Sequence, residues 1–169
     1  EHGSPGPAAA RNHGLAAARG ELIGWLDQDA LWAPDALARM LAPLIADPAL
    51  ELVFGGVRAF ASEEVDPHLR ARMVLPPDAR PGHVPGAMLA RRRLFERVGP
   101  FDPRFRLGDF VEWYMRCRDF GAREAAADHI VLHRRHHAGN YTRRHRHELA
   151  DYARAVHAGW ARRRSGGMA

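Results

Sequence analysis

The chain has 169 residues, a length that suits about one domain with its own hydrophobic core. Hydrophobic residues make up 46% and charged residues 27%, which argues against wholesale disorder, and the single cysteine, Cys117, excludes a disulfide scaffold. The 25 basic residues are all arginine and outnumber 20 acidic ones, for a formal net charge of +5. Because an alanine-rich chain without lysine indicates a coding bias, this charge is weak evidence for nucleic-acid binding.

The first part of the chain alternates between helix and strand. Residues 1–6 are rich in Gly, Pro and Ser and indicate a loose lead-in. We expect a helix over 7–18, because proline is tolerated at the first helical position and a glycine follows the helix end. Residues 21–27 are short and mostly apolar, as in a strand. Apolar residues at helical spacing predict a second helix over 34–47, and 51–60 indicate another strand.

A long polar loop separates this part from the next. It covers residues 61–83 and contains four prolines, and a loop of such length inside a compact domain is usually functional or mobile. A strand is expected at 84–89 and a short helix at 91–98. Residues 109–120 are strongly helical and end at a glycine.

The last part combines a short strand at 128–133, a His/Arg-rich loop and a basic terminal helix over 144–164. Strands separated by helices predict an α/β fold. A basic helix can bind phosphate backbones or an anionic membrane surface. The helix lacks a recognised nucleic-acid motif, so a solvated helix is the favoured interpretation and nucleic-acid binding is not expected.

The location of the protein is predicted from what the sequence does not contain. No segment reaches the roughly 18 consecutive apolar residues of a membrane span. The first residues also lack the basic start and apolar run of a secretory signal. We therefore expect a cytoplasmic protein whose basic end could contact a membrane surface.

The first candidate for chemistry is the segment Asp27-Gln28-Asp29, which follows the predicted strand at 21–27. Residues two apart on an extended segment point the same way, so two carboxylates can converge on a hard cation such as Mg²⁺ or Mn²⁺. Such a cation can neutralise a diphosphate leaving group. Spacing alone favours another interpretation, a loop aspartate with an N-cap for the following helix.

Three blocks of the sequence, in the same order, resemble the family 2 glycosyltransferases of the GT-A fold. This resemblance favours the metal-binding interpretation of the Asp-x-Asp segment. Residues 6–32 place Ala-Arg-Asn on a helix, followed by a strand ending in Asp-x-Asp, a tryptophan and a proline-started helix. The second block is Phe-Glu-Arg-Val-Gly-Pro-Phe-Asp-Pro at 95–103 with Gly-Asp-Phe-Val-Glu-Trp-Tyr-Met-Arg at 108–116, a form similar to a small bacterial subgroup. The third is Arg-Arg-His-His-Ala-Gly-Asn at 134–140. The resemblance implies a partial, Rossmann-like GT-A fold with helices flanking a mixed sheet.

The resemblance also implies a reaction: metal-dependent transfer of a sugar from a nucleotide-diphosphate donor to an acceptor that the sequence does not name. Asp27 and Asp29 would hold Mg²⁺ or Mn²⁺, and His137 would supply a further metal or diphosphate contact. Contacts to the nucleotide or its phosphates are assigned to three arginines, Arg11, Arg134 and Arg135.

Asp109 and Glu112 are the candidates for the catalytic base. They are three residues apart and therefore lie on one helix face, where either could take the proton of an acceptor hydroxyl. Spacing alone favours a structural role, since acids in a first turn complement the helix dipole. Phe110 stands where the resemblance places the base, so both acids remain candidates, with Asp109 ahead. Trp113 and Tyr114 are expected in the core rather than against a sugar.

The resemblance begins in the middle of the family's domain. We therefore expect one domain over 1–169 that lacks the opening nucleotide-binding strands. An alternative function follows, a catalytically inactive remnant that binds a partner or forms a homodimer through an exposed sheet edge.

Overall fold

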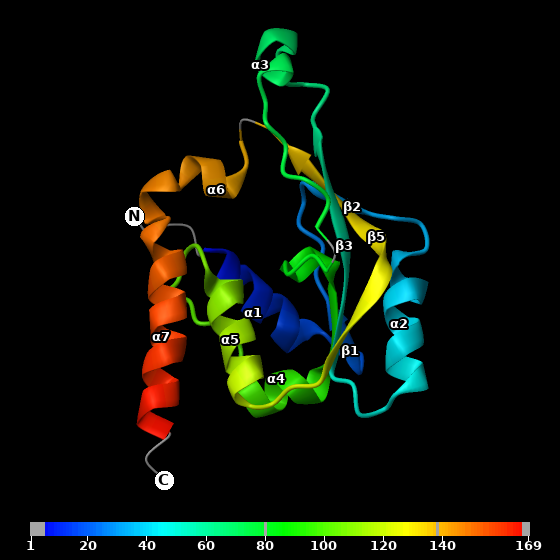
Figure 1. Cartoon of the computed structure of the whole chain (residues 1–169), viewed down its shortest axis with the longest axis vertical. Helices are drawn as coiled ribbons and strands as arrows, with labels where there is room; N and C mark the ends of the chain where they lie inside the picture. Colours follow the sequence, from blue (N-terminus) through cyan, green and yellow to red (C-terminus); the bar gives the residue numbers. More distant parts are fainter. Residues whose placement is uncertain (1–5, 80, 138, 167–169) are drawn as a thin grey trace. The chain divides into compact units, whose positions relative to one another are not determined.

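The computed structural model describes residues 6–79, 81–137 and 139–166. Its helices and strands are interspersed along the chain, and most of them are labelled in Figure 1. In chain order they are α1 (Pro7–Ala17), β1 (Leu22–Gly24), β2 (Ala30–Trp32), α2 (Ala36–Ala46), β3 (Leu52–Ala61), α3 (Pro67–Ala71), η1 (Pro85–Ala87), β4 (Met88–Arg91), α4 (Arg92–Val98), α5 (Asp109–Asp119), β5 (Glu124–His136), α6 (Tyr141–Arg144), η2 (Arg146–Glu148) and α7 (Ala150–Gly166).

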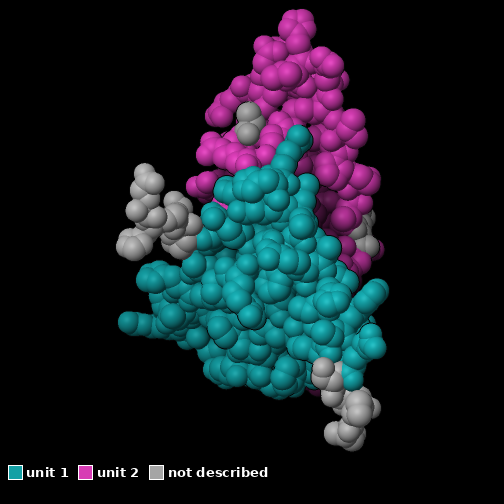
Figure 2. Space-filling model, turned by 90° about the vertical axis from the view of Figure 1, so that its left-hand side faces the viewer, with its two compact units in different colours: residues 1–23, 91–122, 145–169 teal, residues 24–90, 123–144 magenta. Residues whose placement is uncertain are grey.

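The chain divides into two compact units, which Figure 2 shows in different colours. Unit 1 takes the residues up to 23, residues 91–122 and the residues from 145 onward. Unit 2 takes residues 24–90 and 123–144. Each unit is therefore assembled from segments that are far apart in the sequence.

A mixed β-sheet forms the frame of unit 2. The strand order is β1-β4-β3-β5-β2, and the division between the units falls within β1 and β4. β3 pairs in parallel with β5 and antiparallel with β4, while β2 pairs antiparallel with β5. This arrangement confirms the predicted α/β fold with a mixed sheet.

Helix α2 packs against β3 and β5 within unit 2. Its residues Met40 and Leu44 are fully buried, as are Leu52 and Val53 at the start of β3. These side chains recur at helical spacing in α2 and form a continuous run in β3, which is the pattern of a helix covering a strand buried on both faces. The apolar periodicity of the sequence therefore predicted the buried positions of Met40 and Leu44, whereas Leu37 and Ile45 of the same pattern are exposed.

Strand β5 is longer than the sequence predicted. The expected strand ended at 133 and was followed by a loop, whereas β5 continues to His136 and begins already at Glu124. The physical reason is pairing, because β5 runs beside β3 from Leu52 opposite Glu124 to Ala61 opposite His136, with two register shifts around Gly56. The ladder of hydrogen bonds with β3 holds a basic segment extended that has little strand propensity of its own.

The strand expected at 84–89 is displaced. Residues Pro85–Ala87 form a 3₁₀ turn, and the strand β4 begins only at Met88. Pro85 has no N–H to donate to a ladder, and Gly86 packs so closely on β5 that an added Cβ would lie 3.0 Å from a methyl group of Leu132.

The long loop at 61–83 contains a short helix that was not expected. Asp66 caps α3, because its side chain accepts the backbone N–H groups of His68 and Leu69.

Unit 1 is built around the helix α5. Trp113 has no exposed surface, and its ring stacks on Phe95 of α4 with the ring centroids 4.5 Å apart. Its indole N–H donates to the carbonyl of Gly99 at 3.0 Å, so the polar edge of this buried ring is also satisfied. The expectation that Trp113 belongs to the core is confirmed.

Helix α7 packs against α5 within unit 1. The predicted terminal helix over 144–164 is corrected in its start, since α6, η2 and a turn precede α7, which begins at Ala150. The backbone N–H groups of Arg143 and Arg144 donate to the carbonyl of Asn140, which makes their turn separate from α7. Within the described part of the chain, no helix has both the length and the apolar character to cross a bilayer.

Candidate functional site

Asp29, in the predicted Asp-x-Asp segment of unit 2, contacts residues at the end of β5 and in the turn that follows it. The segment forms the connection between β1 and β2, and the Asp29 carbonyl accepts the backbone N–H of Arg135 on β5 at 3.0 Å. The Asp29 carboxylate accepts a hydrogen bond from the Asn140 side chain at 2.5 Å and lies 3.5 Å from Nε2 of His137. Asp27 is exposed. The structure therefore brings Asp29 together with the His137 end of the basic block.

Asn140 joins the members of this cluster, and the sequence patterns assigned it no role. Its side-chain oxygen accepts the backbone N–H of His137 at 2.7 Å, and its amide also donates to the carbonyl of Arg135 at 3.1 Å. One side chain thus joins Asp29, the end of β5 and the turn that follows. The only available signal was its place at the end of the block 134–140, since its partner Asp29 is 111 residues away in the chain.

The hydrogen bonds of His137 indicate which ring nitrogen carries its proton. Nδ1 accepts the backbone N–H of Gly139 at 3.1 Å, so in the neutral ring the proton is on Nε2, toward Asp29. A nitrogen that holds a proton cannot ligate a cation. The arrangement therefore favours His137 as a hydrogen-bond donor over His137 as a metal ligand.

The carboxylates of Asp27 and Asp29 are hard oxygen donors and fit Mg²⁺ or Mn²⁺ in chemical type. Over residues 6–79, 81–137 and 139–166, no group of three or more His, Cys, Asp or Glu side chains is arranged to hold a metal ion. The metal ligands thus stay a prediction.

The end of β5 carries a positive electrostatic environment. Arg134 and Arg135 are half-buried on this strand, opposite Ala59 and Phe60 of β3. Burial, reinforced by the charges of Arg134 and Arg143, lowers the pKa of His136 below its ordinary value. Of these causes, only the arginine charges also favour an anion, because burial disfavours a charge of either sign.

Asp109 lies at the start of α5 in unit 1 and is 5% exposed. Its carboxylate accepts a hydrogen bond from Nη1 of Arg11 on α1 at 2.6 Å. Burial raises the pKa of Asp109 above its ordinary value, although the charge and hydrogen bond of Arg11 act in the opposite direction. A buried carboxylate with a raised pKa and one cationic neighbour is suited to accept a proton.

Helix α7 holds the loop that leads into Asp109. Asp151 is 2% exposed, and its carboxylate accepts the backbone N–H groups of Arg106 and Leu107 at 2.8 and 3.1 Å. Burial raises the pKa of Asp151, but the hydrogen bonds from Arg154 and from the Leu107 and Arg106 backbone outweigh it and lower the pKa overall. The loop is therefore anchored by a carboxylate that stays ionised.

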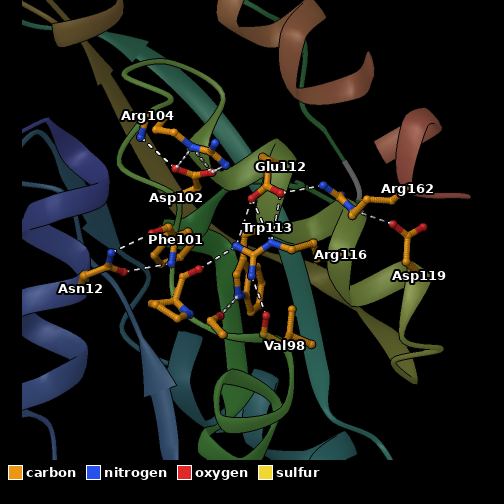
Figure 3. Close-up of polar contacts among 12 residues, drawn as sticks. Asn12, Val98, Phe101, Asp102, Arg104, Glu112, Trp113, Arg116, Asp119 and Arg162 are labelled. Atoms are coloured by element: carbon orange, nitrogen blue, oxygen red, sulfur yellow. Dashed lines mark hydrogen bonds and ion pairs between the residues drawn. The ribbon is translucent and has the colours of Figure 1, made fainter. Parts of the chain in front are cut away.

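Glu112, one turn further along α5, is the centre of an ion-pair network in unit 1 (Figure 3). It is 3% exposed and binds Arg116 of its own helix at 3.0 Å and Arg162 of α7 at 2.9 Å. Arg116 also donates to the carbonyls of Val98 and Pro100, both at 2.6 Å. Glu112 thus ties α5 to α7 and to the turn after α4, which is a structural role.

The aromatic and amide residues of the matched blocks also have structural partners in unit 1. Phe110 is buried and stacks on Tyr114, with the ring centroids 6.1 Å apart. Asn12 exchanges two hydrogen bonds with the backbone of Phe101, at 2.8 and 2.9 Å, as Figure 3 shows. Within the Ala-Arg-Asn sequence on α1, Arg11 therefore binds Asp109, and Asn12 binds the backbone of the turn before α5.

The predicted site residues fall into both units. Arg11, Asp109 and Glu112 belong to unit 1, whereas the others belong to unit 2, namely Asp27, Asp29, Arg134, Arg135 and His137.

Comparison with solved structures shows the fold of the chain. S. aureus TarS residues 1–349 in complex with UDP has a TM-score of 0.60 and 14% identity, covering 92% of this chain and 45% of that one. The complex of the same TarS segment with UDP-GlcNAc has a TM-score of 0.59 and 15% identity, with 82% and 41% covered. Glucosyl-3-phosphoglycerate synthase from Mycobacterium tuberculosis, solved with phosphoglyceric acid, has a TM-score of 0.52 and 18% identity, with 89% and 55% covered. The chain thus spans about half the length of these proteins or less.

The comparison with curated proteins gives no match. The comparison with protein families does, because residues 1–109 match the family described as Glycosyl transferase family 2. The matched range contains the Ala-Arg-Asn sequence and the Asp-x-Asp segment, and it ends at Asp109. With a match over more than half its length and the mixed α/β sheet of its structural neighbours, the chain belongs to glycosyltransferase family 2 and has the GT-A fold.

Proposed function

We propose that the chain binds a nucleotide-diphosphate sugar and transfers its sugar to a hydroxyl acceptor. The observation that carries the proposal is the family match, which spans both acidic segments from Asp27 to Asp109. Crystals of structurally similar TarS contain UDP and UDP-GlcNAc, which supports a nucleotide-diphosphate sugar as the class of donor.

In this proposal, unit 2 receives the diphosphate. Asp27 and Asp29 would hold Mg²⁺ or Mn²⁺, which supplies charge neutralisation for the leaving diphosphate when bound. Arg134 and Arg135 bind phosphate oxygens through their guanidinium groups, which lie half-buried near the end of β5. His137 donates its Nε2 proton to a phosphate oxygen, in accord with the hydrogen bond that its Nδ1 accepts from Gly139.

Asp109 is the proposed base. Its carboxylate takes the proton of the acceptor hydroxyl while the hydroxyl oxygen bonds to the anomeric carbon and the bond from that carbon to the diphosphate breaks. Arg11 favours the ionised form of Asp109 and so keeps it ready to accept the proton. Glu112 is less suited, because Arg116 and Arg162 already occupy its carboxylate.

Donor and metal binding are tested by calorimetric titration of the full chain with UDP and Mn²⁺. We expect the variant Asp27→Ala/Asp29→Ala to bind UDP–Mn²⁺ at least about tenfold more weakly than the parent. A matched control is Glu63→Ala/Glu64→Ala, which removes the same charge from exposed positions of unit 2 and should bind as the parent does. If the Asp27/Asp29 variant binds as well as the parent, the metal assignment is wrong.

The base is tested by UDP release from UDP-sugars. Asp109→Asn should lower the rate per folded molecule by about a hundredfold or more while UDP binding is kept, because an amide cannot accept the proton and the proposed diphosphate contacts belong to unit 2. Glu112→Gln should lower the free energy of unfolding and leave the rate per folded molecule near that of the parent. The reverse pattern would assign the base to Glu112.

The alternative function is a non-catalytic module that binds a partner or a second copy. The burial of Phe110, at the position where the resemblance places the base, favours it. The same titration separates the two functions, since this module requires no UDP binding. Light scattering that shows a strict monomer would contradict its dimeric form.

A further inference from the structure

Helix α7 of unit 1 carries its large apolar side chains on the outside. Tyr152, Val156 and Trp160 are all exposed, and Trp160 is 61% exposed although it is the largest side chain of the helix. These three residues follow one another at intervals of four, so they lie one above the other along the helix. We call them the α7 stripe.

The opposite face of α7, which packs against α5, holds small and polar residues instead. Asp151 and Ala155 are buried, and Arg162 binds Glu112. Gly159 packs so closely on α5 that an added Cβ would lie 2.7 Å from the side chain of Met115. The hydrophobic effect normally places the large apolar residues of a helix on its buried face. The packing of unit 1 therefore does not explain the α7 stripe, which indicates a second contact surface.

The charge on the outside of this segment has one sign. Residues 145–164 contain five arginines and two acids, and neither acid is exposed, since Asp151 is buried and Glu148 is half-buried. Exposed arginines stand at both ends of the α7 stripe, with Arg146 before it and Arg164 after it. An anionic surface complements such a face. A second copy docked through the same face would instead bring like charges together.

We propose that α7 docks on a lipid bilayer that contains anionic phospholipids, with the helix lying in the plane of the interface. A convex helix with an apolar stripe and basic residues is the form in which interfacial helices bind membranes. Tyr152 and Trp160 each combine an apolar ring with one polar group, which suits the boundary between head groups and acyl chains. A bilayer adapts to a convex helix, whereas a protein partner would need a groove that fits it.

The arginine content of the chain does not explain the α7 stripe. A coding bias toward alanine and arginine supplies basic residues, and these alone could hold the chain on any anionic surface. It does not supply a tyrosine, a valine and a tryptophan on the exposed side of one helix. A variant that changes the stripe and keeps the net charge therefore separates the two explanations.

The experiment is flotation of the full chain with vesicles of phosphatidylcholine that contain about 30% phosphatidylglycerol. We expect binding to these anionic vesicles and at least about tenfold weaker binding to phosphatidylcholine alone. Val156→Ser/Trp160→Ser, which keeps the net charge, should weaken binding to the anionic vesicles at least about tenfold. The matched control Leu37→Ser/Ile45→Ser changes two exposed apolar residues of α2 in unit 2 and should bind as the parent does.

A second measurement uses a variant that keeps an aromatic ring. Phospholipids brominated on their acyl chains quench tryptophan fluorescence only at short range, so they should quench the parent through Trp160. The quenching should disappear in Trp160→Phe, whereas Trp113 is fully buried and should not contribute. Quenching that persists in Trp160→Phe would contradict the proposed orientation of α7.

Unchanged vesicle binding in Val156→Ser/Trp160→Ser would overturn the proposal, because the arginines alone would then account for it. Absence of vesicle binding in the parent would also overturn it. Light scattering that shows a dimer lost in the same variant would then assign the α7 stripe to a second copy. Because the substituted side chains are exposed, the denaturant midpoint should stay that of the parent. UDP–Mn²⁺ binding should be unaffected as well, so this proposal and the proposed function can fail separately.

Discussion

Asp109 and Glu112 are one turn apart on α5, and their partners separate their roles. Arg11 reaches Asp109 from α1, whereas Glu112 is bound by Arg116 and by Arg162 from α7. A carboxylate that closes an ion-pair network between helices would lose those bonds if it accepted a proton. The environment therefore favours Asp109 as the base. It favours Glu112 as a residue that stabilises the packing of α5 against α7 in unit 1.

The raised pKa of Asp109 predicts a specific pH dependence of stability. A carboxyl group whose pKa is raised on folding contributes stability below its unfolded pKa, and this contribution is lost as the pH rises through the folded pKa. Relative to Asp109→Asn, the parent should therefore lose free energy of unfolding as the pH increases from acid to neutral. Urea unfolding of both proteins across this pH range measures the difference.

Asp102 provides a control of opposite sign. Its hydrogen bond with Arg104 lowers its pKa despite partial burial, so its contribution is present at neutral pH and lost as the pH falls. The loss in free energy of unfolding caused by Asp102→Asn should thus be largest near neutral pH and become smaller as the pH falls. If Asp109→Asn behaved in the same way as Asp102→Asn, Arg11 would dominate over burial at Asp109.

The junction between the 105–108 loop and α5 depends on a glycine. Gly108 has φ +84°, and a Cβ added there would lie 3.2–3.3 Å from the backbone of Asp151 and Tyr152 on α7. Gly121 has φ +67° at the other end of α5, but a Cβ there would meet nothing within 4 Å. The two positions therefore separate backbone strain from steric contact.

We predict that Gly108→Ala lowers the free energy of unfolding more than Gly121→Ala. The Gly121 variant should lose about 1 kcal/mol from strain alone. The Gly108 variant should lose more, about 2–3 kcal/mol, because α7 must also move away. Denaturant midpoints of the two variants and the parent test this order. Equal losses of free energy of unfolding in the two variants would show that α7 moves away from residue 108 at little cost.

The pairing of β3 with β5 also requires a glycine, for a reason of space. A Cβ at Gly55 would lie 2.2 Å from a methyl group of Val131, whose side chain is fully buried. Gly55→Ala should therefore destabilise the protein by about 1–3 kcal/mol through overpacking. Combined with Val131→Ala, which vacates that space, it should cost less than the sum of the two single variants. Strictly additive losses in denaturant unfolding would contradict this account.

The division into two units has a consequence for truncation. Unit 1 needs α7, whose Asp151 holds the loop before α5 and whose Arg162 binds Glu112, whereas unit 2 uses no residue beyond 144. A chain that ends at Arg144 should thus lose structure selectively. We expect hydrogen exchange to show loss of protection over α5 and retained protection over β3 and β5. Uniform loss of protection across α5, β3 and β5 would mean that the units do not unfold separately.

Much of the fold was predictable because its signals are local. The helix beginning at Pro7, the apolar run at the start of β3 and the helix from Asp109 follow from periodicity and helix-end residues. The length of β5 was not predictable, because residues 134–136 are extended through pairing with β3. The 3₁₀ turn at Pro85 was missed for a similar reason, since close packing on Leu132 governs it.

Within the candidate site, local patterns identified residue types that are candidates for chemistry: the Asp-x-Asp after the first strand, the paired acids opening α5 and the basic block ending in Asn140. They could not say what surrounds each acid or what orients His137. Those answers came from partners far away in the chain, with Arg11 98 residues before Asp109, Arg162 50 residues after Glu112 and Asn140 111 residues after Asp29. Burial and ion pairing depend on such distant contacts, so only folding assigns each carboxylate its environment.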